Sequence, residues 1–525
     1  MTPTTRSFGN LSRRDVFRLG AAAAFGATGL GAAASCGAVP AKPDPNAPQK
    51  RGGTFSHGAT GGGLEDTIDP HFPVTNPDIA RVNNLYEPLL FWDEKYRIQP
   101  ALATEVTPNA DATEWIVKLR KGVIFHHGKE MTADDVLFTM ARVTDPKNTA
   151  PGGTELAKIL DLKNTTALDP YTIKFPLKSP YAVLDQLLAE YTVGIVPSDF
   201  DLKSPVGTGA FKYESFLPGQ YSNFRRHDDY WGQPAWVDEL IIYDFADDAA
   251  KVNALLAGQV QSIDNLPTYL VDSIADQGSS PLISDTGAWV PFTMRVDTGV
   301  YKDVRVRQAL RLVVDRQQMI DQALGGYGFL GNDLYSPFDP AYNDELPQRT
   351  QDIDQAKSLL QQAGQSELQI ELVTSSAVGA GGVESANLFV EQAKLAGIDC
   401  RLTKADAGIF YGEQYLKWPF AQDFWNTRNY IPQVAACAQK DSPYNETHFD
   451  NPEFNELMDR ARRESDEAER TALLQSAQEI EYETGGYIIW GFKRQVDGYS
   501  NLVQGFVPHR YLPCSSFKFQ RVSFV

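Results

Sequence analysis

Residues 115–136 read WIVKLRKGVIFHHGKEMTADDV, and this segment is the most informative one about the fold. Up to Arg120 it alternates apolar with charged side chains, which is typical of a half-buried strand. Lys121-Gly122 then makes a turn, and Thr132 followed three residues later by Asp135 is a good start for a helix. Because strand-like and helix-like segments continue to alternate along the chain, we expect a mixed α/β fold.

Three further helices are predicted from the signals at their ends. Asp303 caps one helix, whose apolar side chains form one stripe as far as Leu324, where Gly325-Gly326 stops it. Asn451-Pro452 starts a second helix, with proline at the first helical position. The third is expected at about 467–484. We find no repeat of fixed period.

The composition bounds the class of protein. With 525 residues, the chain is too long for one ordinary domain and is expected to form two or three. Its residues are 42% hydrophobic and 11% aromatic, which favours large packed cores and argues against a disordered chain. The formal net charge is −19, so nucleic acid, which needs a basic surface, is not an expected partner.

The N-terminus is predicted to be an export signal. Residues 12–18, SRRDVFR, contain a twin arginine, and an apolar run follows from Leu19 to Ala34. As a helix this run would span about 24 Å, which is short of a bilayer core of about 30 Å. Ala33-Ala34-Ser35-Cys36 resembles a lipobox, so Cys36 is the predicted lipidation site, and a Pro-rich linker follows from Ala38 to Pro48. A plain signal peptide with an incidental cysteine is the alternative.

The chain has four cysteines, at positions 36, 400, 437 and 514, and no two have C-x-x-C spacing, so a zinc site is not expected. With Cys36 assigned to the anchor, three remain. One disulfide plus one free buried thiol is one arrangement open to them, and Cys437–Cys514 is then the favoured pair. The sequence does not decide whether that pair forms.

Motifs that would indicate catalysis are weak. Residues 326–331, GYGFLG, match G-x-G-x-x-G, but they follow a predicted helix, whereas a dinucleotide site needs a strand before the glycines and a helix after them. His126, His127 and Glu130 lack the spacing of a metal site. We therefore predict no catalytic residue, cofactor or metal, although two catalytic carboxylates from distant segments would leave no local signature.

Ordered blocks along the chain point to a family. They are Arg51-Gly52-Gly53-Thr54 with Ile68-Asp69-Pro70, Leu85–Leu89 with Pro100–Ala103, residues 115–136, Pro205–Phe211, Pro218-Gly219-Gln220 with Asp229–Gly232, and Asp303–Leu310 with Asp315-Arg316. Together they resemble the extracytoplasmic solute-binding proteins of family 5, which serve peptide and nickel ABC importers. The family usually reads F-H-D-G where this chain has His127 in place of the aspartate.

The resemblance implies an α/β, bilobal fold of the periplasmic-binding-protein type (type II, cluster C) with an inserted domain. Lobe I would comprise 51–96, 204–291 and 492–525, the inserted domain 97–203, and lobe II 292–491, after a signal peptide at 1–35 and a linker at 36–50. A ligand would lie between lobes that close about a hinge.

The resemblance also suggests ligand-binding residues within 421–430, AQDFWNTRNY. In peptide-binding members an aspartate in this region holds the N-terminal ammonium, and Asp423 is the nearest candidate. Arg428 offers a planar fork to a carboxylate, and Trp425, Asn426 and Tyr430 would stack on or surround the ligand. Structural roles, in the core or in an interdomain ion pair, are the alternative for each. Further candidates, placed by the resemblance alone, are Tyr86, Asn265 and Trp289.

The implied function is that of a lipid-anchored, monomeric substrate-binding component of an ABC importer, outside the cytoplasm and not an enzyme. Its partners would be a small-molecule or short-peptide ligand and a permease with ATPase subunits. A peptide or peptide-like ligand is the first choice, and a metal chelate, an opine or a sugar derivative is the alternative. A surface hydrolase or a sensor without an importer are the competing classes.

Overall fold

The structure is a computed structural model that describes residues 42, 47–61, 63–440 and 442–525. The predicted twin-arginine segment and Cys36 lie outside these residues. Everything described below belongs to one unit, Pro40–Val525. Within the described ranges, none of the helices combines the length and the apolar character needed to cross a membrane.

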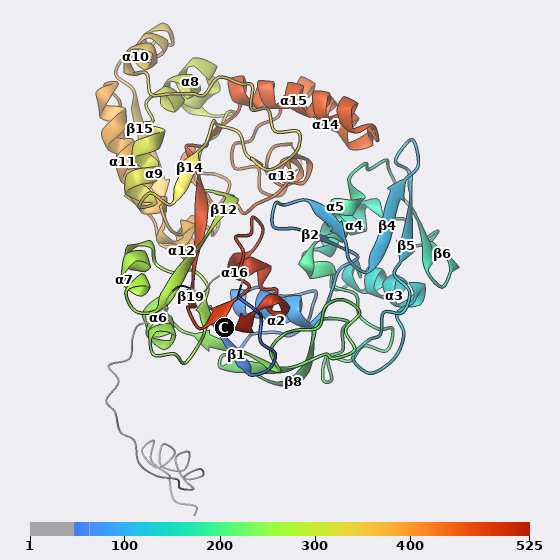
Figure 1. Cartoon of the computed structure of the whole chain (residues 1–525). Helices are drawn as coiled ribbons and strands as arrows, with labels where there is room; N and C mark the ends of the chain where they lie inside the picture. Colours follow the sequence, from blue (N-terminus) through green and yellow to red (C-terminus); the bar gives the residue numbers. More distant parts are fainter. Residues whose placement is uncertain (1–41, 43–46, 62, 441) are drawn as a thin grey trace, which may run out of the picture. The chain divides into compact units, whose positions relative to one another are not determined.

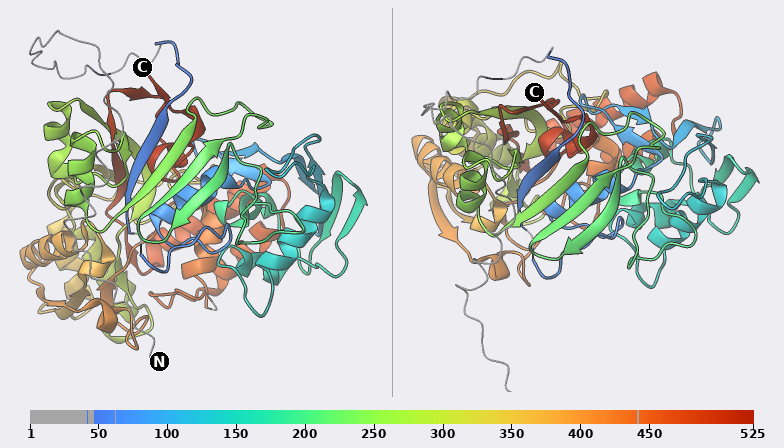
Figure 2. Two further views of the ribbon diagram at one scale, coloured as in Figure 1. Left: turned by 90° about the horizontal axis from the view of Figure 1, so that it is seen from below. Right: turned by 60° about the horizontal axis from the view of Figure 1, so that its bottom comes forward.

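The largest sheet joins segments that lie far apart in the sequence. In spatial order its strands are β12 (Ser279–Trp289), β19 (Gly491–Ser500), β11 (Ser262–Ile263), β1 (Thr54–Thr60), β10 (Glu239–Phe245), β9 (Tyr221–Arg226) and β8 (Phe211–Leu217), with β14 (Gly328–Leu330) paired to β19. β1 is parallel to β10 and β11, as Figure 2 shows for β1 beside the later strands. Phe55, Phe224 and Leu240 fill the core on one face of this sheet, because alternate residues of a strand point to the same side.

A second sheet of five strands lies in the C-terminal half of the chain. Its order is β16 (Asp399–Lys404), β15 (Gln369–Thr374), β17 (Phe420–Gln422), β13 (Phe292–Met294) and β18 (Tyr487–Ile488). Phe292, Leu310, Phe389 and other apolar side chains form its core with the neighbouring helices. The chain passes between the two large sheets at 289–292 and again at 488–491.

A third sheet is formed within residues 97–203. Its strands are β4 (Ala103–Pro108), β5 (Glu114–Leu119), β7 (Thr172–Pro176) and β6 (Thr166–Asp169), and two small hairpin-like pairs elsewhere are β2 (Leu90–Trp92) with β3 (Ile98–Pro100) and β20 (Val503–Gln504) with β21 (Ser523–Phe524). Figure 1 places β4, β5 and β6 on the opposite side of the unit from α9, α10 and α11. One strand of the segment predicted as lobe II, β14, pairs with β19 in the large sheet, and the predicted domain boundaries stay predictions.

Helices surround these sheets. The α-helices are α2 (Asn76–Leu85), α3 (Ala133–Val143), α4 (Gly153–Ile159), α5 (Leu184–Leu188), α6 (Asp248–Leu256), α7 (Val271–Ala275), α8 (Val304–Leu312), α9 (Arg316–Ala323), α10 (Ile353–Gln362), α11 (Gly382–Leu395), α12 (Ala407–Phe410), α13 (Tyr430–Cys437), α14 (Pro452–Arg463), α15 (Glu467–Thr484) and α16 (Pro513–Ser516). The 3-10 helices are η1 (Tyr191–Val193), η2 (Thr268–Leu270), η3 (Gly299–Lys302), η4 (Ser376–Val378) and η5 (Phe519–Arg521).

The helix starts predicted from the sequence are confirmed, and one helix length is wrong. Thr132 and Asp135 form a reciprocal capping box at the start of α3, and the Asn451 side chain accepts hydrogen bonds from the first turn of α14. The single helix predicted from Asp303 to Leu324 is two helices, α8 and α9. The break falls before Asp315, whose side chain accepts from the Gln318 amide and starts a second helix there.

The Cys437–Cys514 pair does not form, so that prediction is wrong. Cys400, Cys437 and Cys514 are all buried free thiols. The Cys437 sulfur accepts a hydrogen bond from the side-chain amide Nε2 of Gln433, whereas the Cys514 thiol donates to the Ile263 carbonyl of the large sheet. The two side chains belong to different hydrophobic cores, and a disulfide requires neighbouring β-carbons.

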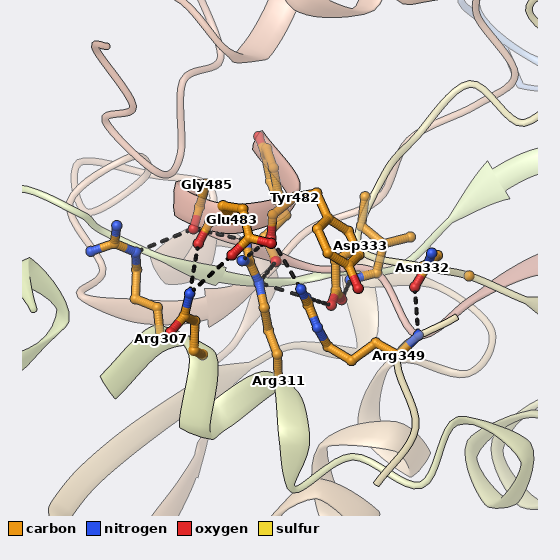
Figure 3. Close-up of polar contacts among 12 residues, drawn as sticks. Arg307, Arg311, Asn332, Asp333, Arg349, Tyr482, Glu483 and Gly485 are labelled. Carbon is orange, nitrogen blue, oxygen red and sulfur yellow. Dashed lines mark hydrogen bonds and ion pairs between the residues drawn. The ribbon is translucent and has the colours of Figure 1, made fainter. Parts of the chain in front are cut away.

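A buried group of arginines shares one carboxylate beside α15 (Figure 3). One Asp333 carboxylate oxygen lies 2.7 Å from a guanidinium nitrogen of Arg316, 2.7 Å from one of Arg349 and 3.9 Å from Nε of Arg311. Its other oxygen accepts the Ile489 amide at 2.9 Å. Burial opposes ionisation of Asp333, but the positive charges of the three arginines outweigh it and hold its pKa below the usual range.

Arg311 of this group, together with Arg307 one turn earlier on α8, completes the C-terminus of α15. Arg311 on α8 donates to the carbonyls of Tyr482, Gly485 and Tyr487, and Arg307 donates to that of Thr484. The last carbonyls of a helix have no partner within the helix, and cations are favourable there. The group therefore anchors α15 to α8 in the part of the chain that also carries the residues predicted to contact the ligand.

Candidate ligand-binding site

A cavity of about 1580 Å³ lies between the parts built on the three sheets. Its lining comes from segments near 60–79, 92–96, 151–192, 265–288, 322–327, 376–384, 426–444 and 493–513. Residues 97–203 also contact the end of α14 and the segment that joins it to α15. The Ala182 amide donates to the Arg462 carbonyl at 2.7 Å, and Ser465 Oγ donates to the Ala110 carbonyl at 2.7 Å. The volume exceeds that of a typical small-molecule pocket, so it is large enough for a ligand of several residues.

Three of the predicted ligand-binding residues line this cavity: Asn265, Asn426 and Arg428. Asn265 has a left-handed φ of 45°, which asparagine tolerates, and its amide oxygen accepts from Gln495 Nε2 at 2.9 Å. Asn426 and Arg428 are exposed, on either side of the buried Thr427. Their role in binding stays a prediction, supported by their position.

Asp423 does not line the cavity. It is 3% exposed, and its two oxygens accept the hydroxyls of Tyr411 and Tyr415, each at 3.0 Å. Burial raises its pKa, and it shares a hydrogen bond with the neighbouring carboxyl of Glu446, whose pKa is also raised by burial and by the Asp423 charge. Asp423 is thus engaged by protein groups, and a role in holding a ligand ammonium stays an untested prediction.

Trp425, Trp289 and Tyr430 pack beneath the cavity wall. The two tryptophan rings are stacked with centroids 6.1 Å apart, and their backbones are bridged by hydrogen bonds. Trp425 Nε1 donates to Glu446 at 3.2 Å, and the Tyr430 hydroxyl donates to Glu481. None of the three lines the large cavity, so they support the loop that carries Arg428.

Tyr86 lies at a separate, smaller pocket of about 180 Å³. Its side chain is 3% exposed, and its hydroxyl donates to the Ile68 carbonyl at 3.2 Å. Trp92, Tyr191 and Tyr511 line both this pocket and the large cavity.

Four aromatic side chains form an aromatic cluster in the large cavity: Trp92, Tyr96, Tyr191 and Tyr511. Trp92 and Tyr96 stack with centroids 4.2 Å apart, and Tyr511 lies 5.7 Å from Tyr96 and 6.0 Å from Tyr191. The Tyr96 hydroxyl also donates to the Thr427 carbonyl at 3.4 Å. This contact joins the cluster to the segment that carries Arg428.

Glu190 is the half-buried acid of the aromatic cluster. One carboxylate oxygen accepts Trp92 Nε1 at 3.3 Å, and the other accepts the Tyr511 hydroxyl. Burial raises the pKa of Glu190, while the Tyr511 hydrogen bond and the positive charge of Arg428 favour its ionised form. Each carboxylate oxygen can accept a further hydrogen bond.

Arg428 is the cation beside Glu190. Its guanidinium carbon lies 5.3 Å from the centroid of the Trp425 ring. Within the ranges that the structure describes, no carboxylate pairs with Arg428 and no acceptor binds its guanidinium. An exposed guanidinium beside aromatic faces and an acid can bind a carboxylate in a planar, two-point manner.

Sequence reasoning missed Glu190 and the aromatic cluster. These residues come from segments near 92–96, 190–191 and 511, and no spacing in the sequence relates them. Their proximity could have been predicted from the sequence only by testing every possible contact between distant segments. Among the described residues, no group of three or more His, Cys, Asp or Glu side chains is placed to hold a metal ion.

A large cavity with polar groups and aromatic walls, set in a multi-sheet α/β fold, is typical of a protein that binds a small solute. Residues 97–445, more than half of the chain, match the family described as bacterial extracellular solute-binding proteins, family 5 Middle. The chain belongs to this family of extracellular solute-binding proteins, which is a family of binding proteins and not of enzymes. The predicted family and fold class are therefore confirmed.

Relatives and solved structures agree with this assignment. The chain is 25% identical over 463 residues to di/tripeptide-binding protein 2 of Pseudomonas aeruginosa, covering 81% of this chain and 86% of the relative. It is 29% identical over 300 residues to the oligopeptide-binding protein AppA of Bacillus subtilis, covering 54% of each chain. The periplasmic binding protein DppA of Helicobacter pylori, solved with the peptide STSA, matches with a TM-score of 0.73 at 23% identity, covering 90% of this chain and 98% of DppA.

Proposed function

We propose that this protein captures a short peptide or peptide-like solute with a free carboxylate and delivers it to its permease. The observation that carries the proposal is Arg428, a cavity-lining guanidinium near Glu190 that has no hydrogen-bond acceptor and no ion pair among the described residues. The carboxylate of the solute would pair with Arg428, and an ammonium would lie against Glu190 and the aromatic cluster.

Two considerations support a peptide-like solute. Glu190 and Arg428 supply opposite charges in the cavity, as a zwitterionic solute requires, and the aromatic cluster shields Glu190 from bulk water. Electrostatic attraction strengthens when water is excluded, so enclosure would favour binding without any chemistry. The relatives named as di/tripeptide-binding and oligopeptide-binding proteins, and DppA with its bound peptide, are consistent with this choice.

The test is binding of peptides to the soluble body from residue 38 onward. Di- and tetrapeptides with a free C-terminus would be compared with their C-terminal amides by isothermal titration calorimetry. We expect Arg428→Ala to weaken binding of the free acids by about 10- to 150-fold, since hydrogen bonds to a charged group are worth about 1.5–3 kcal/mol. The matched control is Arg463→Ala, an exposed arginine at the end of α14 that does not line the cavity.

Native mass spectrometry of the purified body, before and after denaturation, would identify any solute that co-purifies. A released peptide mixture would support the proposal. A single non-peptide compound, or peptide affinities that Arg428→Ala leaves unchanged, would overturn the peptide assignment while leaving the family unaffected.

We also propose that Cys36 carries the lipid that anchors the protein to the cell membrane. The support is the sequence alone: the lipobox-like residues 33–36 and the Pro-rich linker after them. In cells, Cys36→Ser is expected to move the protein from the membrane fraction to the soluble fraction and to abolish labelling by a radioactive fatty acid. Cys400→Ser, at a buried thiol of the body, is the control and should keep both properties. Unchanged membrane association of Cys36→Ser would contradict the anchor.

A further inference from the structure

Lys493 is a second cation of the large cavity without a partner. It lies on β19 and lines the cavity. In the part of the chain that the structure describes, its ammonium has neither a hydrogen-bond acceptor nor a carboxylate within ion-pair distance. Lys251 shows the contrast, because its buried ammonium lies 2.9 Å from Asp264 and 3.1 Å from Asp248.

Lys493 is held close to the segment that carries Arg428. The Lys493 carbonyl accepts the Thr286 hydroxyl at 2.7 Å, and the next amide, that of Gly287, donates to the Thr427 hydroxyl at 2.8 Å. Residues 286–287 belong to the irregular stretch of β12 between Asp285 and Trp289. One short segment of β12 therefore connects both cations, Lys493 on one side and Arg428 next to Thr427 on the other.

The lysine also faces the C-terminal segment that contributes to the aromatic cluster. Lys493, Gln495 and Asp497 share one side of β19, because side chains alternate along a strand. On that side, Asp497 accepts the amides of Cys514 and Asn265. The cavity lining next to this side includes Gln495, Asn265 and Tyr511.

An unpaired ammonium at this position is unfavourable in the absence of ligand. Burial alone lowers the pKa of Lys493, with no opposing contribution from a nearby carboxylate. A half-buried charge in a cavity wall is stabilised by a counter-charge, and a ligand can supply it. The protein as a whole carries −19, so attraction of an anion has to come from local cations such as Lys493 and Arg428.

We infer that Lys493 is a second anion-binding point of the cavity, and that the natural solute carries at least two acid groups, one for Arg428 and one for Lys493. The solute class is then an acidic peptide or peptide-like molecule, such as a short peptide with an aspartate or glutamate side chain. This inference rests on the proposed function and narrows its ligand.

The test uses pairs of tripeptides that differ only in Glu against Gln, or Asp against Asn, at one position. Binding to the wild-type body, Lys493→Met and Lys493→Arg would be measured by calorimetry. The wild type should prefer the acidic member of at least one pair by about tenfold or more. Lys493→Met should lose that preference without changing affinity for the amide member, and Lys493→Arg should keep it. The matched control is Lys357→Met, an exposed lysine on α10 that does not line the cavity.

The outcomes separate this inference from the proposed function. If Arg428→Ala weakens peptide binding but the wild type shows no acidic preference, or Lys493→Met retains one, the inference is overturned and the proposed function stands. If no peptide binds, the proposed function fails. The inference about Lys493 is then tested on the solute that co-purifies with the protein, whose acid groups would be counted by methyl esterification followed by mass spectrometry. Two or more esterified acid groups would uphold the second anion-binding point, and a single one would overturn it.

Discussion

Replacing Asp333 with asparagine is expected to lower the free energy of unfolding by about 3–5 kcal/mol, because it removes the carboxylate shared by Arg311, Arg316 and Arg349. The three guanidinium groups would remain beside one another in the interior without their counter-charge. Burial already lowers the pKa of Arg311 to about 9, so this arginine has little solvent with which to replace the lost interaction.

Asparagine is the informative substitution at this position. Asp333 has a φ of 59°, a left-handed conformation that asparagine tolerates nearly as well as aspartate and that alanine does not. The asparagine oxygen can still accept the Ile489 amide, so the backbone and this hydrogen bond are kept, while the charge and the hydrogen bonds from Arg316 and Arg349 are lost. Alanine would add backbone strain, so its effect on stability could not be separated into the loss of the carboxylate and the strain.

The measurement is urea unfolding of the soluble body at neutral pH, followed by tryptophan fluorescence. The control is Asp321→Asn, an exposed carboxylate on α9, which should change stability by no more than about 0.5 kcal/mol. Adding Arg316→Met to Asp333→Asn should recover part of the loss, since one unpaired charge is then removed. A loss below about 1 kcal/mol for Asp333→Asn would show that the arginines do not depend on this carboxylate.

Much of the fold could be predicted because its signals are local. The capping box of Thr132 and Asp135, the Asn451 cap and the helix 467–484 all depend on residues within a few positions of one another. The glycines at 325–326 adopt positive φ after α9, as expected for a helix end and not for a dinucleotide site. The break between α8 and α9 was missed because an apolar stripe continues across Val313 and Val314, and both are buried.

The site was less predictable because it depends on contacts between distant segments. Arg428 and Asp423 lie five residues apart in one block, yet one lines the cavity and the other is held by Tyr411 and Tyr415. Whether a side chain points into the cavity or the core is set by packing of the whole loop, not by the residue type. Glu190 could not be distinguished from the other acids, since its aromatic partners come from elsewhere in the chain.

Glu481 is expected to contribute stability that is lost as the pH rises from about 5 to 8. Its carboxyl oxygens accept the hydroxyls of Tyr335, at 2.6 Å, and Tyr430. Burial raises the pKa of Glu481 from 4.5 to about 7. The folded state therefore holds its proton more tightly than the unfolded state, so the stabilisation is present below pH 4.5 and is lost as the pH passes through about 7. A shift of this size corresponds to about 3 kcal/mol.

Glu481→Gln isolates this contribution, because the amide resembles the protonated carboxyl and does not ionise. The free energy of unfolding would be measured in urea at pH 5 and pH 8.5 for the wild type, Glu481→Gln and Glu479→Gln, an exposed neighbour on the same helix. We expect the decrease between the two pH values to be smaller in Glu481→Gln by about 3 kcal/mol, and unchanged in Glu479→Gln. An equal decrease in all three proteins would mean that Glu481 is already ionised in the folded state at pH 5, with Arg311 and the tyrosine hydroxyls outweighing its burial.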